Sequence, residues 1–187
     1  MEAKVILLGE SNSGKSSLLM RFLRDQFSAS AAVPTLAPEC GTRTVRSVRL
    51  KVWDITGQDR FRAVARSYYR GAAACVLVCD QSDRASFERL PYWLHEVTRE
   101  LGALPPTLLL CNKSDCASRV GDAELAALCA QHALRGWLRV SAKTGDRVHE
   151  AFQRLAELVE TEQIEAAIEQ DLALALAPTA PRRRWCW

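Results

Sequence analysis

One short segment, Gly9-Glu-Ser-Asn-Ser-Gly-Lys-Ser16, constrains the fold of this chain more than any other feature. It fits the phosphate-binding pattern GxxxxGK[ST], and it lies between a continuous apolar run at residues 5–8 and an amphipathic stretch at residues 18–23. In such a strand–loop–helix unit, backbone N–H groups surround phosphate oxygens and the helix N-terminus favours negative charge. A glycine–serine turn matches this pattern by chance in on the order of one per cent of chains this long. The segment therefore predicts an α/β fold that binds a nucleotide phosphate.

The residues of this segment have separate expected roles. The Lys15 ammonium would reach the outer phosphates, and the Ser16 hydroxyl would bind Mg²⁺. The predicted phosphate-binding set is Ser11, Asn12, Ser13, Gly14, Lys15, Ser16 and Ser17.

The rest of the chain alternates short apolar runs with longer amphipathic stretches. The runs at residues 74–79 and 107–111, and a weaker one at 137–140, are typical of strands buried on both faces. Strands alternating with helices predict a parallel sheet covered on both faces. Around residues 45–53 apolar and polar residues alternate, which predicts a tight antiparallel hairpin at one edge of the sheet.

The composition is that of one ordinary globular domain. The chain has 187 residues, of which 48% are hydrophobic, and a net charge of only +3, which argues against a dedicated nucleic-acid binder. Its seven cysteines are dispersed without a CxxC pair, which favours a reducing compartment. No run approaches ~18 apolar residues, so we expect an intracellular protein whose membrane contact is at most peripheral. The cysteines expected in the core are Cys75, Cys79, Cys111 and Cys129.

Two motifs after later strands indicate which base is bound. Asn112-Lys-Ser-Asp115 follows the third apolar run, at the sheet edge where such folds bind ligands. A carboxylate there can accept from N1–H and from the exocyclic amine of guanine, and adenine offers no such pair. Ser141-Ala-Lys143 follows the last strand and could place a backbone N–H near the guanine oxygen. Alone, NKSD could be a helix-capping turn, and SAK is a weaker signal still, but their order after successive strands favours guanine. The predicted base-side residues are Asn112, Lys113, Asp115, Ser141, Ala142 and Lys143.

A third motif, Asp54-Ile-Thr-Gly-Gln58, ends the hairpin strand. Asp54 would hold Mg²⁺ through a water, the Gly57 N–H would meet the γ-phosphate, and Gln58 would orient the attacking water as the catalytic residue. Without the phosphate-binding segment, an ordinary polar turn would be the better interpretation.

In that order and spacing, GESNSGKS, WDITGQ, NKSD and SAK resemble the Ras superfamily of small GTPases. The segments RFRAV at 60–64, YYRGA at 68–72 and LVCD at 77–80 resemble its Rab branch. The resemblance spans residues 4–160. It implies a P-loop small GTPase fold: a six-stranded, mostly parallel sheet with one antiparallel edge strand and five helices on both faces. The GTP-binding domain would be residues 1–170, with a flexible tail at 171–187.

The same resemblance implies a GTP hydrolase that cycles between GDP and GTP with Mg²⁺ and regulates vesicle traffic. Exchange factors, GTPase-activating proteins and effectors would be its partners. It would act as a monomer in the cytoplasm and peripherally on endomembranes, with features that lean toward the endosome and Golgi.

The chain departs from the family pattern in the expected switches. The first switch is Thr35-Leu-Ala-Pro-Glu-Cys40, in which Thr35 would supply a second hydroxyl to Mg²⁺ but Pro38 lacks an N–H. The second switch has Thr56 where an alanine is usual, which could crowd the attacking water and predicts slow hydrolysis. The effector-facing aromatic triad maps to Cys40, Trp53 and Tyr68.

These departures motivate an alternative, a guanine-nucleotide-binding adaptor that cycles slowly or not at all. A P-loop kinase is a third interpretation, but it gives no reason for NKSD and SAK.

The chain closes with Pro-Arg-Arg-Arg-Trp-Cys-Trp187. Cys186 is a candidate prenylation site, although it stands in neither a CC, a CxC nor a CaaX pattern. The arginines at 182–184 could add attraction to anionic lipid, because one prenyl chain anchors only marginally. An unmodified, disordered tail is the alternative.

Overall fold

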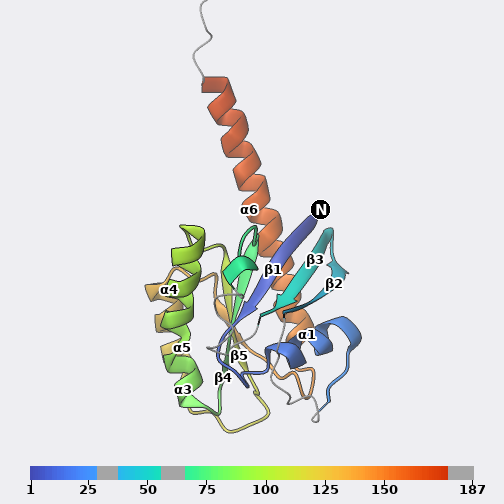
Figure 1. Ribbon diagram of the computed structural model, residues 1–187, viewed down its shortest axis with the longest axis vertical. Helices are drawn as coiled ribbons and strands as arrows, with labels where there is room; N and C mark the ends of the chain where they lie inside the picture. The colour runs from blue at the N-terminus through green and yellow to red at the C-terminus, as the bar shows by residue number, and fades with distance from the viewer. Residues whose placement is uncertain (29–37, 56–65, 177–187) are drawn as a thin grey trace, which may run out of the picture.

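The computed structural model describes residues 1–28, 38–55 and 66–176. Six strands form one sheet in the order β2-β3-β1-β4-β5-β6 (Figure 1). The strands are β1 (Glu2–Leu8), β2 (Glu39–Val45), β3 (Val48–Asp54), β4 (Ala74–Asp80), β5 (Thr107–Asn112) and β6 (Trp137–Arg139). Within the described residues the helices are α1 (Lys15–Arg24), α3 (Arg84–Glu88), α4 (Leu90–Leu101), α5 (Asp122–Gln131) and α6 (Val148–Leu176).

The strand directions confirm the expected sheet. The β2–β3 pair is antiparallel, while β1 pairs in parallel with β3 and β4, and β5 pairs in parallel with β4 and β6. The hairpin between β2 and β3 turns at residues 46–47, where Arg46 has φ 55°. The sheet is therefore mostly parallel with one antiparallel edge.

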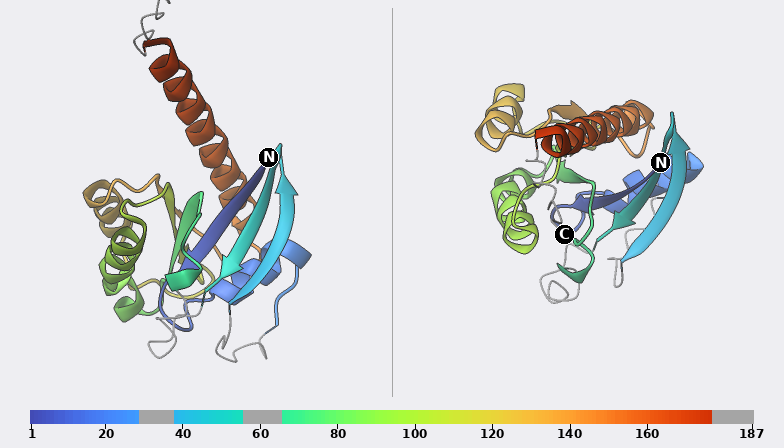
Figure 2. Two further views of the ribbon diagram at one scale, coloured as in Figure 1. Left: turned by 45° about the horizontal axis from the view of Figure 1, so that its top comes forward. Right: turned by 90° about the horizontal axis from the view of Figure 1, so that it is seen from above.

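Alternate side chains of the strands enter two separate cores. Val5 and Leu7 pack on one face with α1 and α6, where the rings of Phe22 and Phe152 stack at 3.8 Å. Ile6 and Leu8 pack on the other face with α3, α4 and α5. Figure 2 shows α4 and α5 side by side, away from α1 and α6. Both faces of the sheet are thus covered, which explains why its central strands are continuously apolar.

The amphipathic stretch from Phe87 to Leu101 is interrupted, although its spacing alone predicts one helix. It divides at Arg89 into α3 and α4, and Pro91 lies in the first turn of α4. Proline lacks the N–H that a continuous helix would need there, but it is well suited to a first helical turn. The helix α5 is a feature that the apolar spacing did not single out; it buries Leu125, Leu128 and Cys129.

The last helix, α6, is much longer than the core requires. Its apolar side chains are buried as far as Val159, whereas Ile164, Ile168 and Leu172 are each about 60% exposed. Figure 1 shows the helix continuing well beyond the sheet. The structure describes this helix as far as Leu176. Among the described residues, no helix is both long and apolar enough to cross a membrane. The division at residue 170 remains a prediction.

Candidate guanine-nucleotide site

The motifs singled out in the sequence meet at one edge of the sheet. The parallel strands β1, β3, β4 and β5 all point toward this edge, so that the segments following them lie together there. The edge lies toward the bottom of the sheet in Figure 1. Carboxyl ends of neighbouring parallel strands are where open α/β sheets bind ligands.

The loop between β1 and α1 depends on two glycines. Gly9 has φ 141°, and an added Cβ would lie 2.1 Å from the carbonyl oxygen of Val78. Gly14 has φ 92°, and its added Cβ would lie 2.2 Å from Nδ2 of Asn112. Asn12 also takes a left-handed conformation, with φ 65°. The loop therefore curls tightly and brings its backbone close to the next motif.

Lys15 lies at the centre of this loop. Its ammonium is almost wholly buried and donates to the carbonyl oxygens of Gly9, at 2.9 Å, and Glu10, at 2.8 Å. Burial lowers the pKa of Lys15 to about 8, although the charges of Asp54 and Glu10 act in the opposite direction. An anion beside this amine would favour its charged form.

Ser16 and Asp54 join the loop to the end of β3. The Ser16 hydroxyl donates to Oδ2 of Asp54 at 2.5 Å, and Asp54 is 1% exposed. The register that pairs Leu7 with Asp54 puts the carboxylate beside the end of β1. A carboxylate and a hydroxyl at this distance are a small set of hard oxygen ligands.

Asn112 connects the phosphate loop to the base motifs. Its Nδ2 donates to the carbonyl oxygen of Ser13 at 2.9 Å, and its Oδ1 accepts from the backbone N–H of Ala142 at 3.1 Å. Both groups of one buried amide are therefore used, and three segments far apart in sequence are fixed relative to one another.

Asp115 is held by residues of the Ser141–Lys143 motif. Its Oδ1 accepts from the Ser141 hydroxyl at 2.7 Å, and its Oδ2 lies 3.4 Å from Nζ of Lys143. The Ser141 hydrogen bond is the main reason that the pKa of Asp115 lies below its usual value. At neutral pH this side chain is an acceptor in a fixed orientation.

Lys113 and Asp80 form a neighbouring ion pair, with Nζ 2.6 Å from Oδ2. Burial disfavours the charged form of Asp80, but hydrogen bonds from Lys113 and Ser82 outweigh it and keep its pKa below the usual value. Lys113 itself has φ 64°, which marks the sharp turn after β5.

Two anchors of this edge were not anticipated from the sequence. Arg21 of α1 donates to the carbonyl oxygens of Ala142, at 2.9 Å, and Lys143, at 2.8 Å. Glu10 accepts from Trp93 of α4 at 3.0 Å and from Arg89 at 3.2 Å. Both pairs join residues far apart in the chain, so no local spacing indicates them.

Comparison with known proteins agrees with this geometry. Residues 4–161 match the model of the Ras family. The chain is 36% identical over 161 residues to Ras-related protein SEC4 of Saccharomyces cerevisiae, covering 84% of this chain and 74% of that one. It is 37% identical over 158 residues to Ras-related protein Rab-1A of Dictyostelium discoideum, covering 82% and 78%. Ras-related protein Rab-13 of Canis lupus familiaris is 35% identical over 159 residues, covering 82% and 77%.

The chain belongs to the Ras family. Its relatives place it in the Rab branch, and members of the family are GTP hydrolases that bind guanine nucleotide. The predicted fold class and family are thereby confirmed.

The described residues of this edge offer groups suited to binding nucleotide phosphates and a metal ion. The Ser13 hydroxyl is buried and has no hydrogen-bond partner in the part of the chain that the structure describes, and the loop geometry excludes a Cβ at Gly14. An anion would pair with Lys15 better than the backbone carbonyls do. One carboxylate, Asp54, beside one hydroxyl, Ser16, is a set that Mg²⁺ accepts together with substrate phosphates.

The three residues expected to face effectors also come together. Cys40 pairs with Trp53 across β2 and β3, and the rings of Trp53 and Tyr68 lie 5.3 Å apart. Cys40 and Cys116 are exposed, whereas the four cysteines expected in the core are buried. Several predicted positions lie outside the described residues: Thr35, Thr56, Gly57, Gln58 and Cys186.

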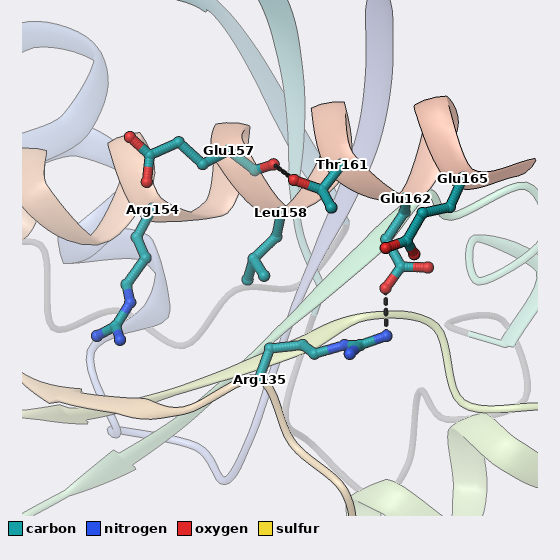
Figure 3. Close-up of a pocket in the computed structure, with 7 residues that line it drawn as sticks. All are labelled: Arg135, Arg154, Glu157, Leu158, Thr161, Glu162 and Glu165. Carbon is teal, nitrogen blue, oxygen red and sulfur yellow. Dashed lines mark hydrogen bonds and ion pairs between the residues drawn. The ribbon is translucent and has the colours of Figure 1, made fainter.

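A pocket of about 270 Å³ lies at the opposite edge of the sheet, between α6 and the segment before β6 (Figure 3). Arg135 forms an ion pair with Glu162 across it, and Leu158 lines it. This pocket is distinct from the nucleotide site, because it lies far from the Ras-family motifs and is lined by residues of both charges.

Proposed function

We propose that this chain is a Rab-like switch that cycles between GDP and GTP and regulates vesicle or membrane traffic inside the cell. The observation that carries the proposal is the buried Asn112 amide, which hydrogen-bonds to the phosphate loop and to the Ser141–Lys143 motif at once. A site that has to hold both ends of one nucleotide needs such a connection. The names of the Rab and SEC4 relatives support the assignment to traffic.

In this proposal the phosphate half of the site uses Lys15 and the backbone N–H groups of residues 11–17. Lys15 exchanges its two carbonyl acceptors for the outer phosphate oxygens, which are better partners because they are charged. Ser16 and Asp54 hold Mg²⁺, with Thr35 as a further ligand in the GTP state. The ion supplies charge neutralisation at the phosphates.

The base half selects guanine. Asp115 accepts from guanine N1–H and the exocyclic amine, and the Ser141 hydroxyl keeps its carboxylate oriented for this task. The backbone N–H at Ala142 or Lys143 donates to the guanine oxygen. Lys113 and Asn112 shape the walls around the base.

Hydrolysis depends on Gln58, which orients the attacking water, and on the Gly57 N–H, which meets the γ-phosphate. Thr56 adds a branched side chain next to this position. We therefore expect an intrinsic rate at or below ~10⁻⁴ s⁻¹, the order found for unassisted small GTPases.

Partners read the state of the switch. Exchange factors and GTPase-activating proteins set its timing, and effectors contact the surface formed by Cys40, Trp53 and Tyr68. Residues 182–187 give peripheral membrane contact, with Cys186 as a candidate lipid site. The G domain itself acts as a monomer.

A time course of GTP hydrolysis tests the proposal. Purified protein loaded with GTP and Mg²⁺ is followed for several hours by chromatography of bound GTP and GDP, with Gln58→Leu alongside. We expect slow conversion to GDP in the wild type and almost none in the variant. Conversion at equal rates in both would overturn the assignment of Gln58, and bound GTP that never converts would favour the adaptor.

A further inference from the structure

A side-chain cluster beside the base motifs has no part in the roles assigned above. Its centre is Arg139, the last residue of β6, whose side chain is 23% exposed. The guanidinium donates to the Ser118 hydroxyl at 3.0 Å, to the Val120 carbonyl oxygen at 2.7 Å and to Asp122 at 2.7 and 2.9 Å. It also approaches Sγ of Cys111 at 3.8 Å. One side chain thus spans the loop that carries Asp115 and the first residue of α5.

Arg139 also orients a buried glutamine. Its Nη1 donates to Oε1 of Gln81 at 2.6 Å, and Gln81 is 3% exposed. Because arginine has no acceptor, this contact requires the amide oxygen of Gln81 to face Arg139. The amide nitrogen then points the other way and donates to the carbonyl oxygen of Cys116.

The backbone of Gln81 holds the same loop at two more points. Its N–H donates to the carbonyl oxygen of Asn112 at 2.9 Å, and its own carbonyl accepts from the Arg119 N–H at 2.7 Å. The loop that follows β5 is therefore attached to Gln81 at its beginning, middle and end.

The residues on either side of Asp115 are both fixed. The Ser114 N–H donates to the Val140 carbonyl oxygen at 3.0 Å, and the Cys116 carbonyl accepts from Gln81. Asp115 therefore stands between one anchor at the residue after β6 and one that Arg139 orients. Side chains that recognise a ligand by two simultaneous hydrogen bonds need such support, because a small rotation costs one of the two bonds.

We propose that Arg139 and Gln81 are positioning residues that set the guanine selectivity of Asp115. Arg139 fixes the orientation of the Gln81 amide, the amide fixes the backbone after Asp115, and the carboxylate then meets both donors of guanine. The inference rests on the proposed role of Asp115. A purely structural role, in which Arg139 only attaches α5 through Asp122, is the competing explanation.

Comparing GDP with IDP separates the two roles, because IDP lacks the exocyclic amine and offers Asp115 one donor fewer. The affinities of both ligands are measured by competition for Arg139→Ala and Gln81→Met. We expect the preference of the wild type for GDP over IDP to fall about fivefold in both, since part of one charge-assisted hydrogen bond is lost. Equal weakening of GDP and IDP would show that the cluster is only structural and would overturn the proposal.

Four further variants make the result specific. Arg139→Lys keeps the charge but not the forked geometry, so it should lose most of the preference while folding normally. Asp122→Ala removes only the contact with α5, and Arg135→Ala breaks an ion pair before β6, so both should keep the wild-type preference. Loss of the preference in Asp122→Ala alone, but not in Arg139→Lys, would count against the proposal. Asp115→Ala tests the underlying role: if it keeps the wild-type preference, the assignment of Asp115 fails rather than that of Arg139.

Discussion

The two halves of the nucleotide-binding edge are built from different groups. The phosphate half is mostly backbone in left-handed conformations, at Gly9, Asn12 and Gly14, around one buried ammonium. The base half consists of side chains that already have partners, such as Asn112 and Asp115. In the phosphate half, the buried Ser13 hydroxyl has no partner among the described residues, and burial has lowered the pKa of the Lys15 amine. In the base half, neighbouring groups lower the pKa of the Asp80 and Asp115 carboxylates.

We therefore expect the phosphate half to determine how tightly a nucleotide binds, and the base half to determine which nucleotide binds. Burying an amine without an anion is unfavourable, and a bound phosphate removes that cost. The phosphate half therefore gains most from the ligand and should dominate affinity. The base half changes little on binding, so it should discriminate among bases while contributing less to total affinity.

The largest effect should come from Lys15→Ala. Removing the ammonium costs two charge-assisted hydrogen bonds to phosphate, which predicts GDP binding at least about 100-fold weaker. Displacement of a fluorescent GDP analogue measures this. The matched control is Lys4→Ala. The Lys4 amine donates to the carbonyl oxygen of Arg70 at 2.7 Å, away from the phosphate loop, so this variant should bind GDP as the wild type does. A similar loss of GDP affinity in both variants would contradict the view that the phosphate half dominates affinity.

A smaller effect, but a change of specificity, should follow from Asp115→Asn. The amide can donate where the carboxylate only accepts, so GDP affinity should fall about tenfold or more and XDP affinity should rise. Competition between the two nucleotides measures the change. Asp83→Asn, which alters the carboxylate that caps α3, is the control. A variant that still strongly prefers GDP would show that the base half does not select in this way.

The smallest effect is a pH dependence of the phosphate half. Without nucleotide the Lys15 pKa is about 8, so its amine is mostly neutral at pH 8.5, whereas bound phosphate favours the charged form and raises the pKa. Binding should therefore take up a proton, about three quarters of one at pH 8.5, and GDP affinity should fall as the pH rises above 8. Calorimetry in two buffers with different heats of ionisation measures the uptake. Equal heats in both buffers at pH 8.5 would contradict it.

The sequence allowed most of the fold to be predicted, and it singled out motif residues that the structure brings to one edge of the sheet, whose roles in binding stay predictions. Continuous apolar runs predicted the central strands, and alternating apolar and polar residues predicted the hairpin. The spacing of apolar residues along a strand reflects whether one face or both faces of the sheet are buried. The motif residues, from Lys15 to Asp115, were identifiable because they are local and their chemistry fixes the residue type. The break at Arg89 and the length of α6 were not evident from the apolar pattern, since a break leaves the helical spacing intact and α6 continues beyond the core.

Residues that act through long-range contacts could not be found in this way. Arg21, Glu10 and Arg139 reach partners between 17 and 122 positions away. The spacing of residues within one helix or strand cannot indicate a contact with a residue in another element. Their role becomes visible only when the sheet order brings β4, β5 and β6 together.

The length of α6 determines how far Leu176 lies from the nucleotide-binding edge. From Val159 to Leu176 the helix advances about 26 Å at 1.5 Å per residue, and it runs away from the edge that carries Lys15 and Asp115. A surface that holds residues beyond 176 would therefore meet the far end of the molecule and leave the nucleotide edge facing outward. The helix would act as a spacer of about 26 Å between that surface and the buried part of the molecule.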